Sequence, residues 1–483
     1  MHGDFAQVSF NAANAFTRVF QQQGRMLLEA ELNEQTAIHL HYQRQLIVDV
    51  IGRCWRAGDS FALKPATSGK DFNIDAGRLY LDGICCELAA NTSFRVQPFS
   101  PLPDNVGADL PDKFVVYAEC WERHRSAAQL PQLREVALNG RDTASRAQIA
   151  WQIRLLTRDI VAETEDRFGT LREIRKSHES PFIYREGSLD DFTTAFNDSA
   201  TKLLQEFDAA APSAEVCKNI RAYMDAQSQI GCLMRARARY ESRNLDPCAL
   251  PADAQFRSRE NQLYRVEIHR SGIAGDDNAT FKWSRENGSV EFSIRDVKVG
   301  EKTITTSIET LGRDRRTGLC EGDWVELTSD DFELAEVAAP LVQITGIDRA
   351  KRVVTMHAPA ALTVDFSKCT LLRRWDQTIE NAPTLTEDGT LPIQESSEGR
   401  WTHIERGVQV QFVPGGLYRH GDYWLIPARV ATNDVIWPQD GDKPAALLPQ
   451  GIERHSGALS FAVNGNPIAF TNCACSIKPQ CDV

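Results

Sequence analysis

The stretch that decides the fold is Gln23-Gly24-Arg25-Met26-Leu27-Leu28-Glu29-Ala30-Glu31-Leu32-Asn33-Glu34-Gln35, near the start of the chain. The run from residue 18 to residue 51 holds no proline, and Gly24 is its only early break, so the sequence predicts a helix over 18–51. At 100° per residue, one face of this helix is apolar at both ends and polar in the middle. That face consists of Leu28, Leu32, Gln35, His39, Gln43, Leu46 and Val50. A long terminal helix without a core of its own is typical of a segment that docks onto a partner.

The polar middle of this face predicts a seam between chains. Buried polar residues such as Gln35 and His39 set register and oligomer state in such seams, at some cost in stability. We expect a homo-oligomer, a trimer above all, in which Arg25 with Glu31 or Glu34 fixes the docking angle through charged hydrogen bonds. The alternative is that the face lies on a domain of its own chain, with its polar residues half exposed. The predicted interface residues are Gly24, Arg25, Leu28, Leu32, Asn33, Gln35, His39 and Leu46.

The totals exclude several classes of protein. A chain of 483 residues is long enough for roughly two to four modules. Its 42% apolar and 25% charged content is typical of soluble globular proteins, and a net charge of −12 disfavours nucleic-acid binding. No run approaches the roughly 20 apolar residues of a membrane span. The opening Met1-His2-Gly3-Asp4 lacks the pattern of a signal peptide, so we expect synthesis in the cytoplasm without a cleaved leader.

Beyond a helical arm over residues 1–56, the pattern predicts an α+β fold that is mainly antiparallel β. Residues 57–160 alternate with period two, with strands at 114–121 and 147–156 that should pair, and we expect an antiparallel module there. Residues 161–255 are dense in charge and predict a helical insertion or connector. Its clearest helix carries Phe192, Phe196, Leu203, Leu204 and Phe207, with Asp190 or Asp191 as its cap, and a second short helix is expected at 214–221.

The second half of the chain resumes short strands at intervals that predict a β-sandwich or barrel over residues 256–375. The Asn287-Gly288 pair favours a type I′ turn, and Lys282 or Arg285 with Glu286 suits a cross-strand ion pair. Residues 376–438 predict a hairpin module in which 407–412 pairs with 422–426. Residues 439–483 are expected to form a C-terminal tail.

Candidate catalytic motifs are incomplete. Gly58-Asp59-Ser60-Phe61 is similar to the nucleophile block of GDS-type esterases, which need a preceding strand and a downstream Asp-x-x-His. Residues 53–56 do not form an apolar strand pattern, and Glu453 with His455 has the wrong spacing, so we expect a loop. Phosphate-binding glycine motifs are absent. We therefore expect no enzyme and no cofactor.

Metal and thiol chemistry is also weakly indicated. His39 and His41 point about 200° apart on a helix and cannot share an ion through one face. Three thiols gather at Cys473, Cys475 and Cys481, but no second cluster of matching spacing completes a zinc site. We expect no metal and unpaired thiols, with a disulfide formed after release as the alternative.

Tryptophans lie on or beside predicted strands, where burial in a core is the commoner fate of an aromatic side chain. They are Trp121, Trp151, Trp283, Trp324, Trp375, Trp424 and Trp437. The alternative is a sugar-binding cleft. A glycan- or surface-binding module would use aromatic residues such as Trp401, Tyr418 and Tyr423 at the contact.

Several blocks along the chain together resemble a bacterial family of unknown function found beside genes of phage-tail-like contractile injection systems. They are Gly3-Asp4-Phe5, residues 22–35, residues 77–83, Trp121-Glu122-Arg123-His124, residues 134–138, residues 260–269, residues 281–289, residues 371–376 and residues 418–429. Residues 22–35 are also similar to the opening of phage tail-fibre and baseplate proteins.

The resemblance implies a structural, non-enzymatic part of a contractile tail-like particle, at the baseplate or at fibre attachment. Its partners would be copies of itself and other particle subunits, and the protein would leave the cell, if at all, with the particle. The family brings no catalytic residues to carry over. A hydrolase or toxin cargo is the third interpretation, and the missing triad and metal motifs disfavour it.

Overall fold

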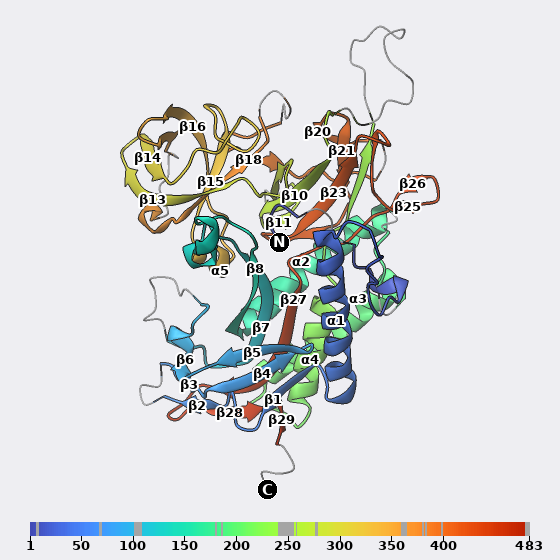
Figure 1. The fold of residues 1–483 in the computed structure, drawn as a ribbon. Helices are drawn as coiled ribbons and strands as arrows, with labels where there is room; N and C mark the ends of the chain where they lie inside the picture. The colour runs from blue at the N-terminus through green and yellow to red at the C-terminus, as the bar shows by residue number, and fades with distance from the viewer. Residues whose placement is uncertain are drawn as a thin grey trace.

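The computed structural model describes residues 1–5, 9–66, 70–100, 109–178, 181–184, 187–239, 256, 258–275, 279–358, 365–378, 381, 384–397 and 399–478. Figure 1 shows two lobes, with the first and last parts of the chain in the lower lobe and the middle in the upper lobe. Strands outnumber helices, most strand pairs are antiparallel, and a long helix lies near the N-terminus. The predicted α+β class is confirmed.

The lower lobe is built on one four-stranded antiparallel sheet in the order β28-β27-β7-β8. Its strands are β7 (Lys113–Arg125), β8 (Arg146–Leu156), β27 (Arg454–Val463) and β28 (Ala469–Asn472). The predicted strands at 114–121 and 147–156 lie within β7 and β8 and pair along their whole length, with Cys120 opposite Trp151. The predicted pairing is therefore confirmed.

Residues 439–483 do more than form a tail, which corrects the prediction. The chain returns through β27 to the centre of the sheet and pairs with β7, with Ala462 opposite Phe114. It then adds β28 and places β29 (Cys475–Ile477) parallel to β1 (Cys54–Ala57). The strands β27 and β29 were missed because their partners, β7 and β1, lie more than 300 residues away, where no local signal reports them.

Three helices cover one face of this sheet, and their side chains share its core. They are α2 (Arg158–Ser177), α3 (Leu189–Asp208) and α4 (Val216–Gln227). The second of the two expected helices therefore begins at Val216, and α2 was not expected. The cap of α3 is Ser188, whose hydroxyl accepts from the N–H of Asp191 while the Asp191 carboxylate accepts from Ser188, so Asp191 completes a capping box from the third helical position.

Two small sheets cover the other face and bury a second core that includes Phe72, Leu79, Leu81 and Phe114. One has the order β29-β1-β4-β5, with β4 (Gly77–Leu81) and β5 (Ile84–Leu88). The other consists of β2 (Leu63–Pro65), β3 (Phe72–Ile74) and β6 (Thr92–Ser93). The β4–β5 hairpin turns at Asp82 and Gly83, whose φ angles of 45° and 79° suit the primed turn that glycine favours.

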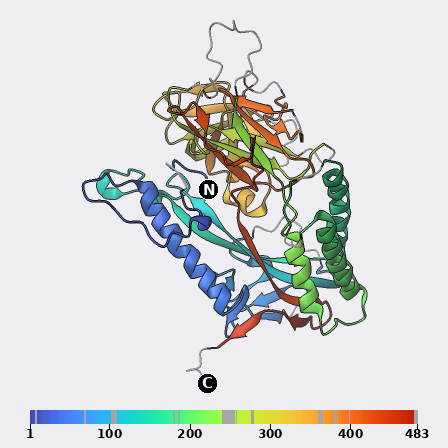
Figure 2. The same cartoon turned by 90° about the vertical axis from the view of Figure 1, so that its right-hand side faces the viewer.

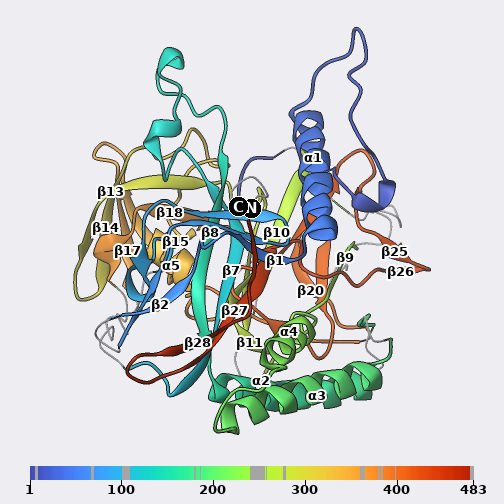
Figure 3. The ribbon, with the colours of Figure 1, turned by 90° about the horizontal axis from the view of Figure 1, so that it is seen from below.

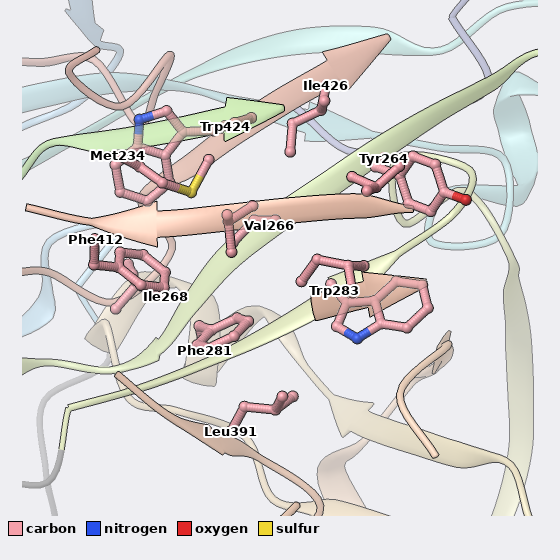
Figure 4. Close-up of a cluster of buried hydrophobic side chains, with 14 of the residues drawn as sticks. Met234, Tyr264, Val266, Ile268, Phe281, Trp283, Leu391, Phe412, Trp424 and Ile426 are labelled. Atoms are coloured by element: carbon pink, nitrogen blue, oxygen red, sulfur yellow. The ribbon is translucent and has the colours of Figure 1, made fainter. Parts of the chain in front are cut away.

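The upper lobe contains a sandwich of a five-stranded sheet, β19-β12-β10-β23-β24, and a three-stranded sheet, β20-β21-β9. Its strands are β9 (Met234–Ala238), β10 (Gln262–Arg270), β12 (Thr280–Ser284), β19 (Leu391–Pro392), β20 (Thr402–Glu405), β21 (Val408–Phe412), β23 (Tyr423–Arg429) and β24 (Asp434–Val435). Figure 4 shows how Met234 and Phe412 of one sheet meet Val266, Phe281 and Trp424 of the other.

The predicted pairing of 407–412 with 422–426 is wrong. The strand β21 pairs with β9 and β20, whereas β23 pairs with β10 and β24 in the opposite sheet. The chain between them crosses from one sheet to the other instead of turning back as a hairpin. Glu395 stabilises this crossing by accepting from the N–H groups of Gly415 and Gly416, each at 2.9 Å.

A closed six-stranded barrel is inserted into the sandwich, in the order β13-β14-β17-β16-β15-β18. Its strands are β13 (Glu291–Val299), β14 (Thr303–Ile308), β15 (Trp324–Thr328), β16 (Leu341–Asp348), β17 (Val353–His357) and β18 (Leu371–Trp375). Residues 256–375, expected as one module, thus divide between the sandwich and the barrel. A short helix, α5 (Asp330–Ala335), lies between β15 and β16 and faces the lower lobe (Figure 1).

The remaining elements are short. Two-stranded pairs are formed by β11 (Gly272–Ile273) with β22 (Leu417–Tyr418), and by β25 (Gln439–Asp440) with β26 (Lys443–Pro444). Five 3₁₀ turns are described: Ala12–Asn14, Phe94–Val96, Pro131–Leu133, Val136–Leu138 and Phe366–Lys368. No helix among the described residues is long and apolar enough to cross a membrane.

The N-terminal helix, α1, spans Glu29–Val50 and begins later than predicted. The segment before it turns at Gly24, whose φ of 71° lies in the left-handed region, and Leu28 precedes the helix without a side-chain cap. Figure 2 shows α1 along one side of the lower lobe, away from α2, α3 and α4 on the opposite side.

One pair of cysteines is bonded. Cys217 in α4 and Cys473, between β28 and β29, form a disulfide with an S–S distance of 2.03 Å. The expectation of unpaired thiols is therefore wrong for Cys473, whereas Cys475 is free and exposed and Cys481 lies outside the described residues. The burial of the seven predicted core tryptophans is confirmed.

Candidate functional site

One face of α1 fastens the helix to the lower lobe. Ile38 is its single fully buried residue among those described, and Arg44 forms an ion pair with Glu122 of β7. The helix backbone also approaches the β4–β5 turn, because a Cβ atom on Gly83 would lie 2.7 Å from the Cα atom of Arg44. Ala30, Glu34, His41 and Val48 fall on this same covered side.

The opposite face of α1 is bare and apolar. Leu32, Leu46 and Val50 are 59%, 63% and 73% exposed, and they lie on the face that the sequence marks as a seam. Among the residues that the structure describes, eleven of the twenty large exposed apolar side chains fall between residues 16 and 51. They are Phe16, Phe20, Met26, Leu27, Leu28, Leu32, Leu40, Tyr42, Leu46, Val50 and Ile51, and we call them the α1 apolar surface.

The predicted interface residues are distributed around this surface. Gly24 and Arg25 lie in the exposed turn ahead of the helix, and Asn33 is exposed on its flank. Gln35 and His39 meet through their Nε2 atoms at 3.0 Å in the middle of this face, where Gln35 is half-buried and its Oε1 atom accepts from the N–H of Val19 at 2.8 Å. Leu28, Leu32 and Leu46 lie at its two ends, on either side of this polar pair. The structure brings these residues together but does not test whether a partner covers them.

The first residues of the chain do something that the sequence did not indicate. His2 inserts between the lobes, and its Nε2 atom lies 2.7 Å from Oε2 of Glu267. Asn287 donates from Nδ2 to the carbonyl of Gly3 at 3.0 Å, and a Cβ on Gly288 would lie 2.6 Å from the His2 ring. Residues 1–5 are therefore a strap to the upper lobe, distinct from α1. The only sequence signal for this contact was the Asn287-Gly288 turn motif. A turn motif does not indicate which distant segment packs against it.

A cavity of about 210 Å³ lies where the lobes meet, and a buried ion network forms one of its walls. Glu267 lies 2.5 Å from Nε of Arg265 and 3.3 Å from Nζ of Lys282, which in turn lies 2.7 Å from Glu326. All four side chains are nearly inaccessible to solvent. The network joins β10 and β12 of the sandwich to β15 of the barrel.

The predicted pairing of Lys282 or Arg285 with Glu286 is wrong. Lys282 points into the ion network, and Arg285 lies 2.6 Å from Glu405 and 3.1 Å from Asp376. Glu286 instead pairs with Arg316 at 2.7 Å. Lys282 lies within β12, whereas Arg285 and Glu286 lie in the turn after it, and each of the three side chains pairs with a residue of another segment.

A second charge cluster joins the lower lobe to α5 and the sandwich. Glu119 of β7 and Glu336, which ends α5, are surrounded by Arg154, Arg419 and Arg454. Two of these distances are 3.2 Å, from Arg154 to Glu119, and 3.1 Å, from Arg454 to Glu336. Each arginine faces a carboxylate, so the arrangement fastens the modules together. None of these five residues is left as an unpaired acid or base for catalysis.

A model of a family of unknown function, DUF6519, matches residues 1–483 of the chain. The chain belongs to the DUF6519 family. No curated protein matches it. Among solved structures, a crystal structure of TssK matches this chain at 8% identity and a TM-score of 0.17. The matched region covers 74% of this chain and 96% of the TssK chain. A TM-score of this size is too low to establish a shared fold.

Three histidines that line the inter-lobe cavity of this DUF6519 protein, His2, His124 and His420, are held neutral, and so is His269, whose ring centre lies 6.3 Å from that of His420. Burial, reinforced by Arg265 and Arg373, lowers the pKa of His2 well below its usual value, and burial with Arg373 lowers the pKa of His124 to about 3. Burial, reinforced by Lys282, lowers the pKa of both His269 and His420. A buried neutral imidazole beside arginines suits tight packing, and its protonation opposes the folded state.

These shifts predict that the protein loses stability in mild acid. Below about pH 6.5 each of the four histidines takes up a proton when the chain unfolds but not while it is folded, so stability falls as pH falls. Asp422 acts in the opposite direction, because burial raises its pKa to about 7. His124 alone, whose pKa of about 3 lies far below this range, contributes a loss of about 1 kcal/mol between roughly pH 6.5 and 5.5, and the other three histidines act in the same direction. Urea unfolding at the two pH values measures it.

The variant His124→Gln serves as the control for this prediction. It cannot be protonated, so the pH dependence of its unfolding free energy should be shallower by about 1 kcal/mol over the same interval. A parent protein as stable at pH 5.5 as at pH 6.5 would contradict the assignment of neutral histidines.

Other sequence candidates are occupied by structural roles. A strand, β1, does precede Gly58-Asp59-Ser60, contrary to expectation, but the Ser60 hydroxyl donates to the carbonyl of Ala57 at 2.5 Å. The Nδ1 atom of His455 lies 3.0 Å from a carboxylate oxygen of Asp82, so this histidine is already paired with another residue. In the described ranges, no group of three or more His, Cys, Asp and Glu side chains is placed to hold a metal ion.

The aromatic residues considered for glycan contact do not form one surface. Tyr418 is buried, and its hydroxyl donates to Glu395 at 2.9 Å. Trp401 is half-buried with the Arg237 guanidinium 4.0 Å from its ring centre, and Tyr423 is half-buried with Arg265 at 3.6 Å. The face of each half-buried ring is thus already covered by a cation.

Proposed function

We propose that this DUF6519 protein is a non-enzymatic structural subunit of a phage-tail-like contractile particle, at the baseplate or at fibre attachment. It assembles as a homo-oligomer, a trimer above all, through the α1 apolar surface. The observation that carries the proposal is the concentration of exposed apolar side chains on that surface. Its place in a particle is supported by the resemblance of residues 22–35 to the opening of tail-fibre and baseplate proteins.

The α1 apolar surface is large enough to drive assembly. Burying one leucine contributes about 1.5–3 kcal/mol, and each chain offers Leu28, Leu32 and Leu46 on one face. Contributions of this size from several chains offset the roughly 4–15 kcal/mol that association costs. The Gln35–His39 pair in the middle of the face would set the register between helices.

A second projection points in the same direction as the segment ahead of α1. Figure 3 shows the segment ahead of α1 and the loop between β7 and β8 projecting in the same direction from opposite sides of the molecule. Val136 and Leu138 near the tip of that loop are exposed, and Arg134 at its base holds Glu309 of the barrel segment through two contacts of 2.6 Å. An apolar tip that projects in the same direction as the segment ahead of α1 supports a second contact with a neighbouring subunit.

The double substitution Leu32→Asp with Leu46→Asp tests the oligomer. We expect the parent protein to have about three times the 54.0 kDa mass of one chain by light scattering, and the variant to have the mass of one chain, because a buried carboxylate without a partner opposes association. The substitutions leave residues 1–5 in place, which deleting the whole arm would not.

The matched control is Val299→Asp with Ile183→Asp, two exposed apolar residues away from α1. This variant should keep the mass of the parent. A parent protein with the mass of a single chain, or an equal loss of mass in both variants, would remove the oligomer from the proposal. Mass spectrometry of purified contractile particles tests the rest, since a particle assembled without this protein would refute a structural role. A binding signal on a glycan array would favour the alternative of a surface-binding module.

A further inference from the structure

A wide cleft separates the sandwich from the barrel in the upper lobe. Its volume is about 1,120 Å³, and residues from both modules line it. Six arginines contribute to the lining: Arg259, Arg285, Arg315, Arg316, Arg374 and Arg406. Five carboxylates line it as well, so the lining carries one net positive charge in a chain whose net charge is −12.

The floor of the cleft is rigid and electrically balanced. Arg374 is buried and donates to the carbonyls of Arg315, Arg316 and Gly318 at 3.3, 2.6 and 2.5 Å, which fixes the loop that carries Arg315 and Arg316. Arg374 also lies 3.2 Å from Asp376. Arg285 is held between Asp376 and Glu405, so the floor charges compensate one another and orient the rim.

The rim of the cleft carries unbalanced positive charge. Arg259 and Arg315 are exposed and form no ion pair among the described residues. Arg406, at the tip of the β20–β21 turn, donates to the Ser258 hydroxyl at 2.7 Å, which directs its guanidinium toward the cleft. Arg316 pairs with Glu260 and Glu286, and Arg406 lies 4.0 Å from Glu405. Arg259 and Arg315 are thus the two rim arginines without a carboxylate partner among the described residues, and the whole lining holds six arginines against five carboxylates.

We propose that this cleft binds an acidic peptide segment of a partner protein, as an interface separate from the α1 apolar surface. Guanidinium groups bind carboxylates through paired, charge-assisted hydrogen bonds, and several of them fixed around a cleft select a chain of carboxylates. The volume exceeds the roughly 300–1,000 Å³ of sites for small molecules, which favours a polymeric ligand.

A sugar polymer fits the cleft less well than a peptide. Sugars stack on exposed aromatic faces, but the aromatic lining residues, Phe256 and Trp375, are each only 1% exposed. The net charge of −12 opposes nonspecific binding of an acidic peptide to the rest of the surface. Binding of such a peptide would therefore report on a local positive site.

Fluorescence anisotropy with a labelled octaglutamate peptide and the full-length protein tests the inference. We expect saturable binding that weakens steeply as salt rises from about 50 to about 500 mM. The triple substitution Arg259→Glu, Arg315→Glu and Arg406→Glu should weaken binding by at least about tenfold, because each change removes an attraction and adds a repulsion. Circular dichroism verifies that the variant is folded.

The matched control reverses three exposed charges on the outside of the barrel, Lys298→Glu, Lys302→Glu and Arg349→Glu. It changes the net charge of the protein by the same amount and should bind the peptide within about twofold of the parent. Equal weakening by both triple variants, or no saturable binding by the parent, would overturn the proposal. Tighter binding of dextran sulfate than of the peptide, lost in the same triple variant, would also overturn it in favour of a sulfated glycan.

Discussion

Replacing Glu267 by alanine should lower the free energy of unfolding by about 3–5 kcal/mol, the largest effect of any single substitution that we predict. Glu267 is buried and faces Arg265, Lys282 and His2 at 2.5, 3.3 and 2.7 Å. Without its carboxylate, two cations remain away from water with less compensation. The midpoint of urea unfolding, followed by circular dichroism and by tryptophan fluorescence, measures the change.

A control on the barrel surface separates this effect from the loss of any carboxylate. Glu301 is exposed at a strand end, so Glu301→Ala should change stability by less than about 0.5 kcal/mol. Glu267→Gln keeps the shape and removes only the charge, and it should cost nearly as much as Glu267→Ala. If Glu267→Ala were as stable as Glu301→Ala, the network would not stabilise the junction of the sandwich and the barrel.

Removing the Cys217–Cys473 disulfide should lower stability by about 2–5 kcal/mol, the second large effect. The bond links residues separated by 256 positions, and a cross-link that closes so long a loop strongly restricts the unfolded chain. It also links α4 covalently to the segment between β28 and β29. Thermal unfolding of the double variant Cys217→Ser with Cys473→Ser, without reductant, measures the loss.

The exposed Cys475 provides the matched control, because it lies two positions from Cys473 and is unpaired. Cys475→Ser should unfold like the parent protein. Dithiothreitol should bring the parent to the stability of the double variant and leave the double variant unchanged. A parent protein indifferent to reductant would show that this disulfide makes no contribution.

Local sequence signals predicted those parts of the fold whose partners are close in the chain. The strands β7 and β8 were predictable because their period-two pattern recurs within about 30 residues. The barrel strands likewise follow one another at short intervals. In each case the pairing costs little chain entropy, so local preference and final structure agree.

Long-range partners explain what the sequence could not predict. Nothing around Cys217 distinguishes Cys473 from the other cysteines as its partner, and the side chain of Lys282 gives no indication that Glu326 lies opposite. The helix α2 was missed because charge dominates its composition, although Val161, Phe168 and Leu171 bury one side of it. These pairings depend on how distant segments pack against one another, and a local sequence pattern carries no information about that packing.

The candidate site was predicted in part. The bare face of α1 coincides with the face read from Leu28 to Val50, because helical periodicity is a local property. The strap formed by His2 and the arginine cleft were missed, since both depend on loops that meet only in the folded molecule.

The position of β27 between β7 and β28 also governs how the protein emerges from the ribosome. At about 5–20 residues per second, translation from Arg125 to Arg454 takes roughly 16–66 s, and during that time β7 has no neighbour on one edge. An unpaired strand edge of this length can pair with another chain and aggregate. We therefore expect a chaperone to bind the nascent chain until β27 has been synthesised.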